Sequence, residues 1–160
     1  MQIEFNLPHV FTRQSSDVDN ARALRALLDC MVQLNLAYIE MHPTKSLYDS
    51  GVRYGRTKIW EPIPALYARG IGDCKSLAAA RVAELRMHGV QCRTVFRWAP
   101  RSDGNKDFHI LIQTPKGWED PSKKLGMLDK DVNRFYVDTG TMVPGESVGF
   151  FSKLVTWFRT

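Results

Sequence analysis

The run from Gly70 to Ala80, Gly-Ile-Gly-Asp-Cys-Lys-Ser-Leu-Ala-Ala-Ala, constrains the fold more than any other part of the chain. Its two glycines allow the backbone to turn sharply, and strong helix formers follow them. Asp73 is a favourable N-cap residue, so the sequence predicts a helix from Cys74 to His88 that stops at Gly89. Unpaired N–H groups and the positive end of the helix dipole favour a thiolate at that start. Cys74 is therefore predicted to be a nucleophile.

A cysteine nucleophile needs a base, and the base needs a group that orients it. The predicted strand 107–113 contains His109, and after a turn the chain returns with Asp120. Asp103 and Asp107 are alternative carboxylate partners for His109. Asp103 lies in a polar turn and Asp107 shares the strand of His109, so Asp120 is the preferred partner.

The other histidines are weaker candidates for the base. His88 is expected in the last turn of the cysteine helix, a helix length away from Cys74. His9 and His42 lie beside prolines in loop-like sequence and have no assigned role.

Four segments carry a resemblance to a known family. They are Gly72-Asp73-Cys74-Lys75, the helix end at residues 83–90, the histidine strand, and Asp120-Pro121-Ser122. Together, over about residues 60–127, they resemble the transglutaminase-like superfamily of papain-type thiol enzymes. Within it, Trp-Glu-Pro-Ile-Pro at residues 60–64 and Glu-Asp-Pro-Ser-Lys at residues 119–123 are similar to small bacteriophage-encoded members. The resemblance implies that Cys74 is the nucleophile, His109 the general base and acid, and Asp120 the orienting carboxylate.

Such a triad attacks an amide or ester carbonyl and forms an acyl-enzyme, which water or an amine then resolves. The expected function is thiol-dependent acyl transfer or hydrolysis at a protein or peptide amide. The alternative is a non-catalytic or latent phage virion structural or assembly protein built on the same fold. An oxyanion hole also needs a donor upstream of the nucleophile, and the candidates for it or for the cleft wall are Trp60 and Tyr67. Simple packing of both rings is the other interpretation.

The composition narrows the remaining functions. The chain has 160 residues, a net charge of +5 and a pI of about 9.2. Its basic residues are scattered without a nucleic-acid-binding motif, so we expect no nucleic-acid partner. No apolar run is long enough to span a bilayer, and no acidic loop fits a calcium site, so we expect no membrane partner, metal or cofactor.

The cysteines indicate the compartment. Their number is odd, and no apolar signal segment follows Met1, which predicts a cytoplasmic location in a bacterial host, with virion association as a further option. Two of the three are expected to be small core residues: Cys30 in a helix and Cys92 in a strand.

The predicted architecture is a single α+β domain over residues 1–160. A papain-like, transglutaminase-like core at about residues 60–127 packs the nucleophile helix on a small antiparallel sheet. A short strand at residues 2–7 and a long amphipathic helix capped near Ser16 and ending before Pro43 precede it. Further elements are expected at 52–54 (strand), 63–69 (helix), 91–98 (strand) and 134–138 (strand). The apolar tail at about residues 147–160 is expected to dock on the domain or to bind a partner such as a phage structural protein.

Overall fold

The fold is seen in a computed structural model that describes residues 10, 14–100, 102–103 and 106–128. The predicted strands at 2–7 and 134–138, the apolar tail at 147–160 and His9 lie outside the described residues. The single-domain assignment therefore stays a prediction.

The long N-terminal helix is confirmed as α1 (Asp17–Met41). Ser16 is its N-cap, and the Ser16 hydroxyl accepts a hydrogen bond from the Asp19 N–H at 3.1 Å. One face of α1 is buried, and its apolar members recur at helical spacing: Ala21, Leu24, Leu28, Met31 and Val32. This face packs against α3 and the sheet in the main hydrophobic cluster.

The cysteine helix is α3 (Cys74–Met87), as predicted. Gly89 has a φ of +72°, a conformation that favours glycine, and the Val90 N–H returns to the Leu85 carbonyl at 2.8 Å. The small and branched residues along α3 are fully buried: Leu77, Ala78, Ala79, Ala80, Val82 and Ala83. Neighbouring elements therefore cover this helix on nearly every side.

The sheet is antiparallel, in the order β3 (Arg93–Pro100), β4 (Lys106–Thr114) and β5 (Gly117–Glu119). The predicted hairpin of β3 and β4 is confirmed, and His109 pairs with Arg97 across it. β5 pairs only with residues 112–114 of β4. Beyond the end of β5, the edge of β4 is available to contact the start of α3.

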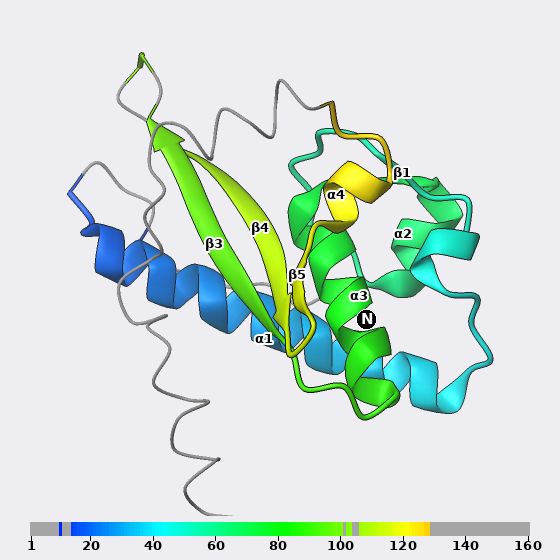
Figure 1. Cartoon of the computed structure of the whole chain (residues 1–160). Helices are drawn as coiled ribbons and strands as arrows, with labels where there is room; N and C mark the ends of the chain where they lie inside the picture. The colour runs from blue at the N-terminus through cyan, green and yellow to red at the C-terminus, as the bar shows by residue number, and fades with distance from the viewer. Residues whose placement is uncertain (1–9, 11–13, 101, 104–105, 129–160) are drawn as a thin grey trace, which may run out of the picture.

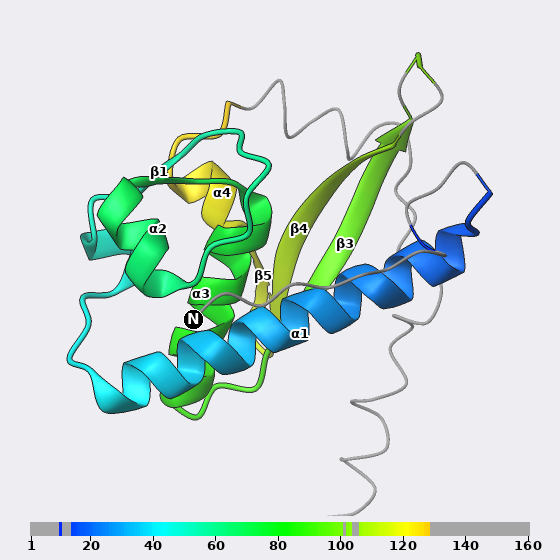
Figure 2. The same cartoon turned by 180° about the vertical axis from the view of Figure 1, so that it is seen from behind.

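Shorter elements lie on the side of α3 that faces away from the sheet (Figures 1 and 2). The predicted strand and helix at 52–54 and 63–69 are confirmed as β1 (Arg53–Tyr54) and α2 (Ile63–Arg69). Three elements were not predicted, namely η1 (Leu47–Asp49), β2 (Ile71–Gly72) and α4 (Pro121–Lys124). β2 pairs in parallel with β1 and carries the chain directly into α3.

Figures 1 and 2 show how these parts are arranged. α3 lies between the sheet on one side and α2 and α4 on the other, and α1 runs across both halves. This is the predicted α+β class, with the nucleophile helix packed against a small antiparallel sheet. Within the described ranges, no helix is long and apolar enough to cross a membrane.

The packing of α1 predicts a clear difference between two of its leucines. Leu28 is fully buried, whereas Leu34 is 38% exposed on the same helix. We expect Leu28→Ala to lower the free energy of unfolding by about 2–5 kcal/mol, because it removes buried methyl groups and leaves a cavity. Leu34→Ala, the matched control, should cost less than about 1 kcal/mol. Urea unfolding measures both, and equal losses would contradict this packing.

Candidate active site

Cys74 is the first residue of α3, and its sulfur lies against the edge of β4. The thiol donates to the Phe108 carbonyl at a sulfur–oxygen distance of 3.8 Å, and the Ile110 N–H also faces the sulfur. These two backbone groups flank His109 on the strand. The fold therefore brings the predicted nucleophile and the predicted base to the same short stretch of β4.

The prediction of a stabilised thiolate is wrong for this resting structure. The residue is half-buried, but its sulfur points inward, and burial together with the nearby Asp73 carboxylate raises the pKa of Cys74 to about 12. Lys75 and the Ile110 N–H act in the opposite direction but do not compensate. Desolvation of the sulfur thus outweighs the start of the helix, and Cys74 is a neutral thiol near pH 7.

Asp73 is the N-cap residue of α3, as predicted, but its side chain makes no capping hydrogen bond. The carboxylate instead pairs with Lys75, whose ammonium group also donates to the Thr57 carbonyl at 2.7 Å. The other oxygen, Asp73 Oδ1, is buried without a hydrogen-bond partner among the described residues. An incompletely paired carboxylate therefore lies next to the nucleophile.

His109 and Asp120 form the second half of the site. His109 Nε2 lies 2.8 Å from Asp120 Oδ2, and the histidine side chain is only 1% exposed. Because a carboxylate only accepts hydrogen bonds, Nε2 donates, and Nδ1 of the neutral ring keeps its lone pair. Nδ1 is then the nitrogen that can take a proton from a nucleophile.

Asp120 has a second task at the start of α4. Its other oxygen, Oδ1, accepts a hydrogen bond from the Lys123 N–H at 3.1 Å and caps the helix. Both carboxylate oxygens thus accept hydrogen bonds, which fixes the orientation of the Asp120 side chain relative to His109. Of the three carboxylates considered from the sequence, Asp120 is the one bonded to His109 Nε2.

The structure separates the two oxyanion candidates. Trp60 is half-buried and packs against the same cluster as Cys74, and the next residue, Glu61, donates its N–H to Ser76 Oγ at 3.1 Å. Trp60 therefore remains a candidate for the oxyanion or cleft donor. The Tyr67 hydroxyl instead donates to Glu84, which lies ten residues after Cys74 on α3, or about 15 Å along the axis.

The Tyr67 hydroxyl also donates to the Lys45 carbonyl at 3.2 Å, so its donor is engaged far from the thiol. This placement corrects the expectation that Tyr67 lines the cleft. Spacing in the sequence put both residues upstream of the nucleophile, but only the tertiary fold decides which way each ring points.

Tyr54 is the residue near the thiol that the sequence did not single out. Burial raises the pKa of its phenol, and the neighbouring Cys74 sulfur raises it further, an effect that requires the two side chains to be close. On β1, Tyr54 pairs with Gly72, two residues before Cys74. Its placement depends on the parallel pairing of β1 with β2, which no local pattern indicates.

Metal binding finds no support within the part of the chain that the structure describes. No group of three or more histidine, cysteine, aspartate or glutamate side chains is arranged there to hold an ion. All three cysteines are free, with Cys92 buried as predicted and Cys30 only half-buried. The expectation of a metal-free and cofactor-free site stays a prediction.

A comparison with known protein families identifies the family to which the chain belongs. The model of the transglutaminase-like superfamily matches residues 13–119. The chain belongs to the transglutaminase-like superfamily. The match includes Cys74 and His109 and ends one residue before Asp120. Neither a curated protein nor a solved structure matches the chain.

Membership in the transglutaminase-like superfamily confirms the resemblance seen in the sequence and suggests thiol-dependent acyl transfer or hydrolysis. The resemblance to bacteriophage-encoded members is not tested by this match and stays a prediction.

The buried thiol predicts slow alkylation of Cys74. A thiol with a pKa of about 12 is ionised roughly a thousandfold less at pH 7 than one with the ordinary value near 9. We expect iodoacetamide to modify Cys74 more slowly than Cys30 at pH 7, with a rate that keeps rising above pH 9. Mass spectrometry of the intact and digested protein measures both sites. Rapid modification of Cys74 below pH 7 would show a preformed ion pair and contradict this prediction.

The carboxylate of Asp73 is predicted to suppress the thiolate. Asp73→Asn removes a negative charge next to the sulfur, so the pKa of Cys74 should fall and its alkylation at pH 8 should accelerate by about tenfold. Glu40→Gln, which removes an exposed carboxylate from α1, is the matched control and should leave the rate unchanged. An equal rate in the wild type and Asp73→Asn would show that burial alone holds the thiol neutral.

Proposed function

We propose that this protein is a thiol enzyme that transfers or hydrolyses the acyl group of a protein or peptide amide. The observation that carries the proposal is the 2.8 Å contact of His109 Nε2 with Asp120 Oδ2, directly beside the β4 edge that receives the Cys74 thiol. In this proposal Cys74 is the nucleophile, His109 the general base and acid, and Asp120 the group that orients His109.

The first step follows from the neutral state of the thiol. As the Cys74 sulfur attacks the substrate carbonyl carbon, its proton passes to His109 Nδ1, so no free thiolate has to form beforehand. The Asp120 carboxylate stabilises the imidazolium that results. Collapse of the tetrahedral intermediate breaks the carbon–nitrogen bond, and His109 gives its proton to the departing amine. A thioester on Cys74 remains.

The second step regenerates the cysteine. Water or an amine, deprotonated by His109, attacks the thioester carbonyl and expels the Cys74 sulfur, which recovers its proton. Water gives a carboxylic acid, as in a peptidase or amidase, and an amine gives a new amide, as in transamidation. No electron transfer is involved, so the proposed reaction needs no cofactor.

Charge on the carbonyl oxygen has to be stabilised in both steps. Two side chains near Cys74 carry suitable donors, the indole N–H of Trp60 and the hydroxyl of Tyr54. Trp60 packs against the same cluster as Cys74, and Tyr54 pairs with Gly72, two residues before Cys74. We propose these two residues as the oxyanion or cleft donors.

The buried thiol favours one alternative function. A site whose nucleophile is desolvated, with a pKa of about 12, also fits a latent or non-catalytic structural or assembly protein that has kept the fold. In this case the apolar tail at 147–160, outside the described residues, is proposed to bind a phage structural protein. The protein is then expected in the virion rather than only in the host cytoplasm.

Acetylation by p-nitrophenyl acetate distinguishes the two functions without knowledge of the substrate. We expect the wild type to acquire one acetyl group on Cys74, detected by mass spectrometry. His109→Ala should slow this acetylation by about a hundredfold or more, because the base that takes the thiol proton is lost. His88→Ala, which removes an exposed histidine at the other end of α3, is the matched control and should acetylate normally.

The fate of the acetyl group tells the two reactions apart. Loss of the label in buffer indicates hydrolysis, and faster loss with added glycine ethyl ester, with formation of its N-acetyl product, indicates transfer to amines. If Cys74 is not acetylated in the wild type, or is acetylated equally fast in His109→Ala, the enzyme proposal fails and the assembly role is favoured.

A further inference from the structure

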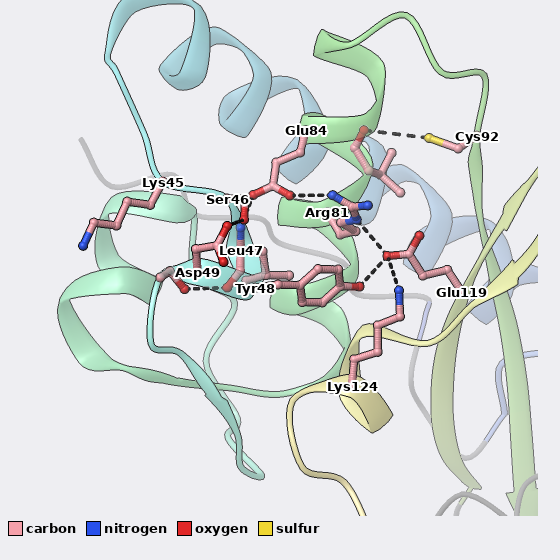
Figure 3. A network of polar contacts seen from close by, with 12 residues as sticks. Lys45, Ser46, Leu47, Tyr48, Asp49, Arg81, Glu84, Cys92, Glu119 and Lys124 are labelled. Carbon is pink, nitrogen blue, oxygen red and sulfur yellow. Dashed lines mark hydrogen bonds and ion pairs between the residues drawn. The ribbon is translucent and has the colours of Figure 1, made fainter.

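Glu119, the last residue of β5, is held by three donors on one carboxylate oxygen. Glu119 Oε1 accepts from Arg81 Nε at 2.7 Å and from the Tyr48 hydroxyl, and lies 3.4 Å from Lys124 Nζ (Figure 3). Burial alone would raise the pKa of Glu119, but these hydrogen bonds and positive charges outweigh burial and lower it. The carboxylate is therefore charged at neutral pH, with its Oε1 held by these three groups.

The donors come from different elements, so the contact joins them. Arg81 lies on α3, Tyr48 on η1 and Lys124 on α4. The Arg81 guanidinium lies 4.9 Å from the Tyr48 ring centroid and Lys124 Nζ lies 4.7 Å from it, so both cations contact one aromatic ring. Figure 3 shows these side chains meeting between α3 and the start of α4.

Arg81 is itself fixed from its other side. Its NH1 group donates to Glu84 Oε2 at 3.1 Å. The other oxygen of Glu84 accepts from the Leu47 N–H and from the Tyr67 hydroxyl. Glu84 is buried, so a helix, the η1 turn and α2 together determine where the Arg81 guanidinium points.

The contact with Glu119 connects the two halves of the candidate site. Arg81 lies seven residues, or two helical turns, after Cys74, and therefore on the same face of α3 about 10 Å away. Glu119 directly precedes Asp120, which bonds to His109. A rigid path thus runs from Cys74 along α3 to Arg81, across to Glu119, and through one peptide bond to Asp120.

The sheet alone holds the end of β5 and the start of α4 only weakly. β5 has three residues and pairs with only residues 112–114 of β4, and α4 has four residues. A buried charge pair is also a poor way to gain stability, because well-packed apolar residues of similar volume often do as well or better. Fixing direction is what an arginine fork adds over apolar packing.

We propose that Arg81 and Glu119 are positioning residues that set Asp120, and through it the His109 ring, relative to Cys74. The inference rests on the proposed function for its catalytic meaning. Arg81 and Glu119 touch neither the substrate nor the thiol. They act by keeping the end of β5 at a fixed place against the nucleophile helix.

The test compares Glu119→Gln with the double variant Arg81→Met/Glu119→Gln. The first removes the negative charge but keeps the side-chain shape, and we expect Cys74 acetylation to slow by about ten to a hundredfold from pH 6 to pH 9, because displaced catalytic groups lose that much. In the double variant no unpaired Arg81 charge remains opposite position 119, although Glu84 loses its Arg81 partner, so the melting temperature should recover in part while acetylation stays slow.

Gln113→Ala is the matched control. It removes the 2.8 Å contact of Arg93 Nε with Gln113 Oε1 in the same sheet without touching Glu119, and acetylation should keep its wild-type rate. If acetylation recovers together with the melting temperature in the double variant, or falls equally in Gln113→Ala, the network only supports the fold and the inference is overturned.

A second readout does not depend on activity. The proton on His109 Nε2, assigned by its loss in His109→Ala, should give a sharp NMR signal protected from water by Asp120. We expect this signal to broaden in both Glu119 variants and to persist in Gln113→Ala. If the signal is unchanged in both Glu119 variants, the positioning role is overturned, even if acetylation fails altogether. If instead Cys74 is acetylated equally fast in the wild type and in His109→Ala, only the proposed function is rejected.

Discussion

The close packing of α3 is the constraint on which the rest of the structure depends. Its alanines at positions 78, 79, 80 and 83 are fully buried, so α1, the sheet and the shorter helices approach the α3 backbone closely. Cores of this density leave little room for larger side chains. The helix is therefore held firmly along its length, and its first residue, Cys74, has a fixed position relative to every element that surrounds it.

The same burial determines the chemistry that Cys74 can perform. A helix start favours negative charge, but that effect is modest. At Cys74 the sulfur lies against β4, and removal from water is the largest influence on its pKa. A nucleophile in this environment depends on a base that takes its proton during the reaction. In the proposed triad that base is His109, which Asp120 orients.

Local patterns in the sequence predicted the elements whose backbone hydrogen bonds form within a helix or between strands that are adjacent in the sequence. Helical periodicity and the Ser16 cap gave the bounds of α1 to within a residue or two, and alternation gave the β3 and β4 hairpin. Of the two paired strands, β1 was predicted and β2 was not. Each is only two residues long and is defined by a partner that is distant in the sequence. Propensity carries no information about such a pairing.

Side-chain choices were harder to predict than backbone elements. Asp73 has the right type and place for a capping residue, yet its carboxylate pairs with Lys75, since a full charge nearby outcompetes a backbone N–H. Tyr67 was placed near the cleft by its position upstream of Cys74, and the buried carboxylate of Glu84 takes its hydroxyl instead. In both cases a charged residue decided the outcome, two positions away for Asp73 and seventeen for Tyr67, and sequence spacing alone does not fix that geometry.

The neighbourhood of Glu119 and Asp120 shows why two carboxylates in succession have different roles. Successive residues at the end of a strand point in opposite directions, so one of the pair faces α3 while the other faces His109. Glu119 meets Arg81 on the first side, and Asp120 meets His109 on the second. A displacement of the backbone at Glu119 also displaces Asp120, because a single planar peptide unit joins their Cα atoms. In the proposed positioning role, the nucleophile helix holds Asp120 in place through Glu119 more firmly than the three-residue strand that precedes Asp120.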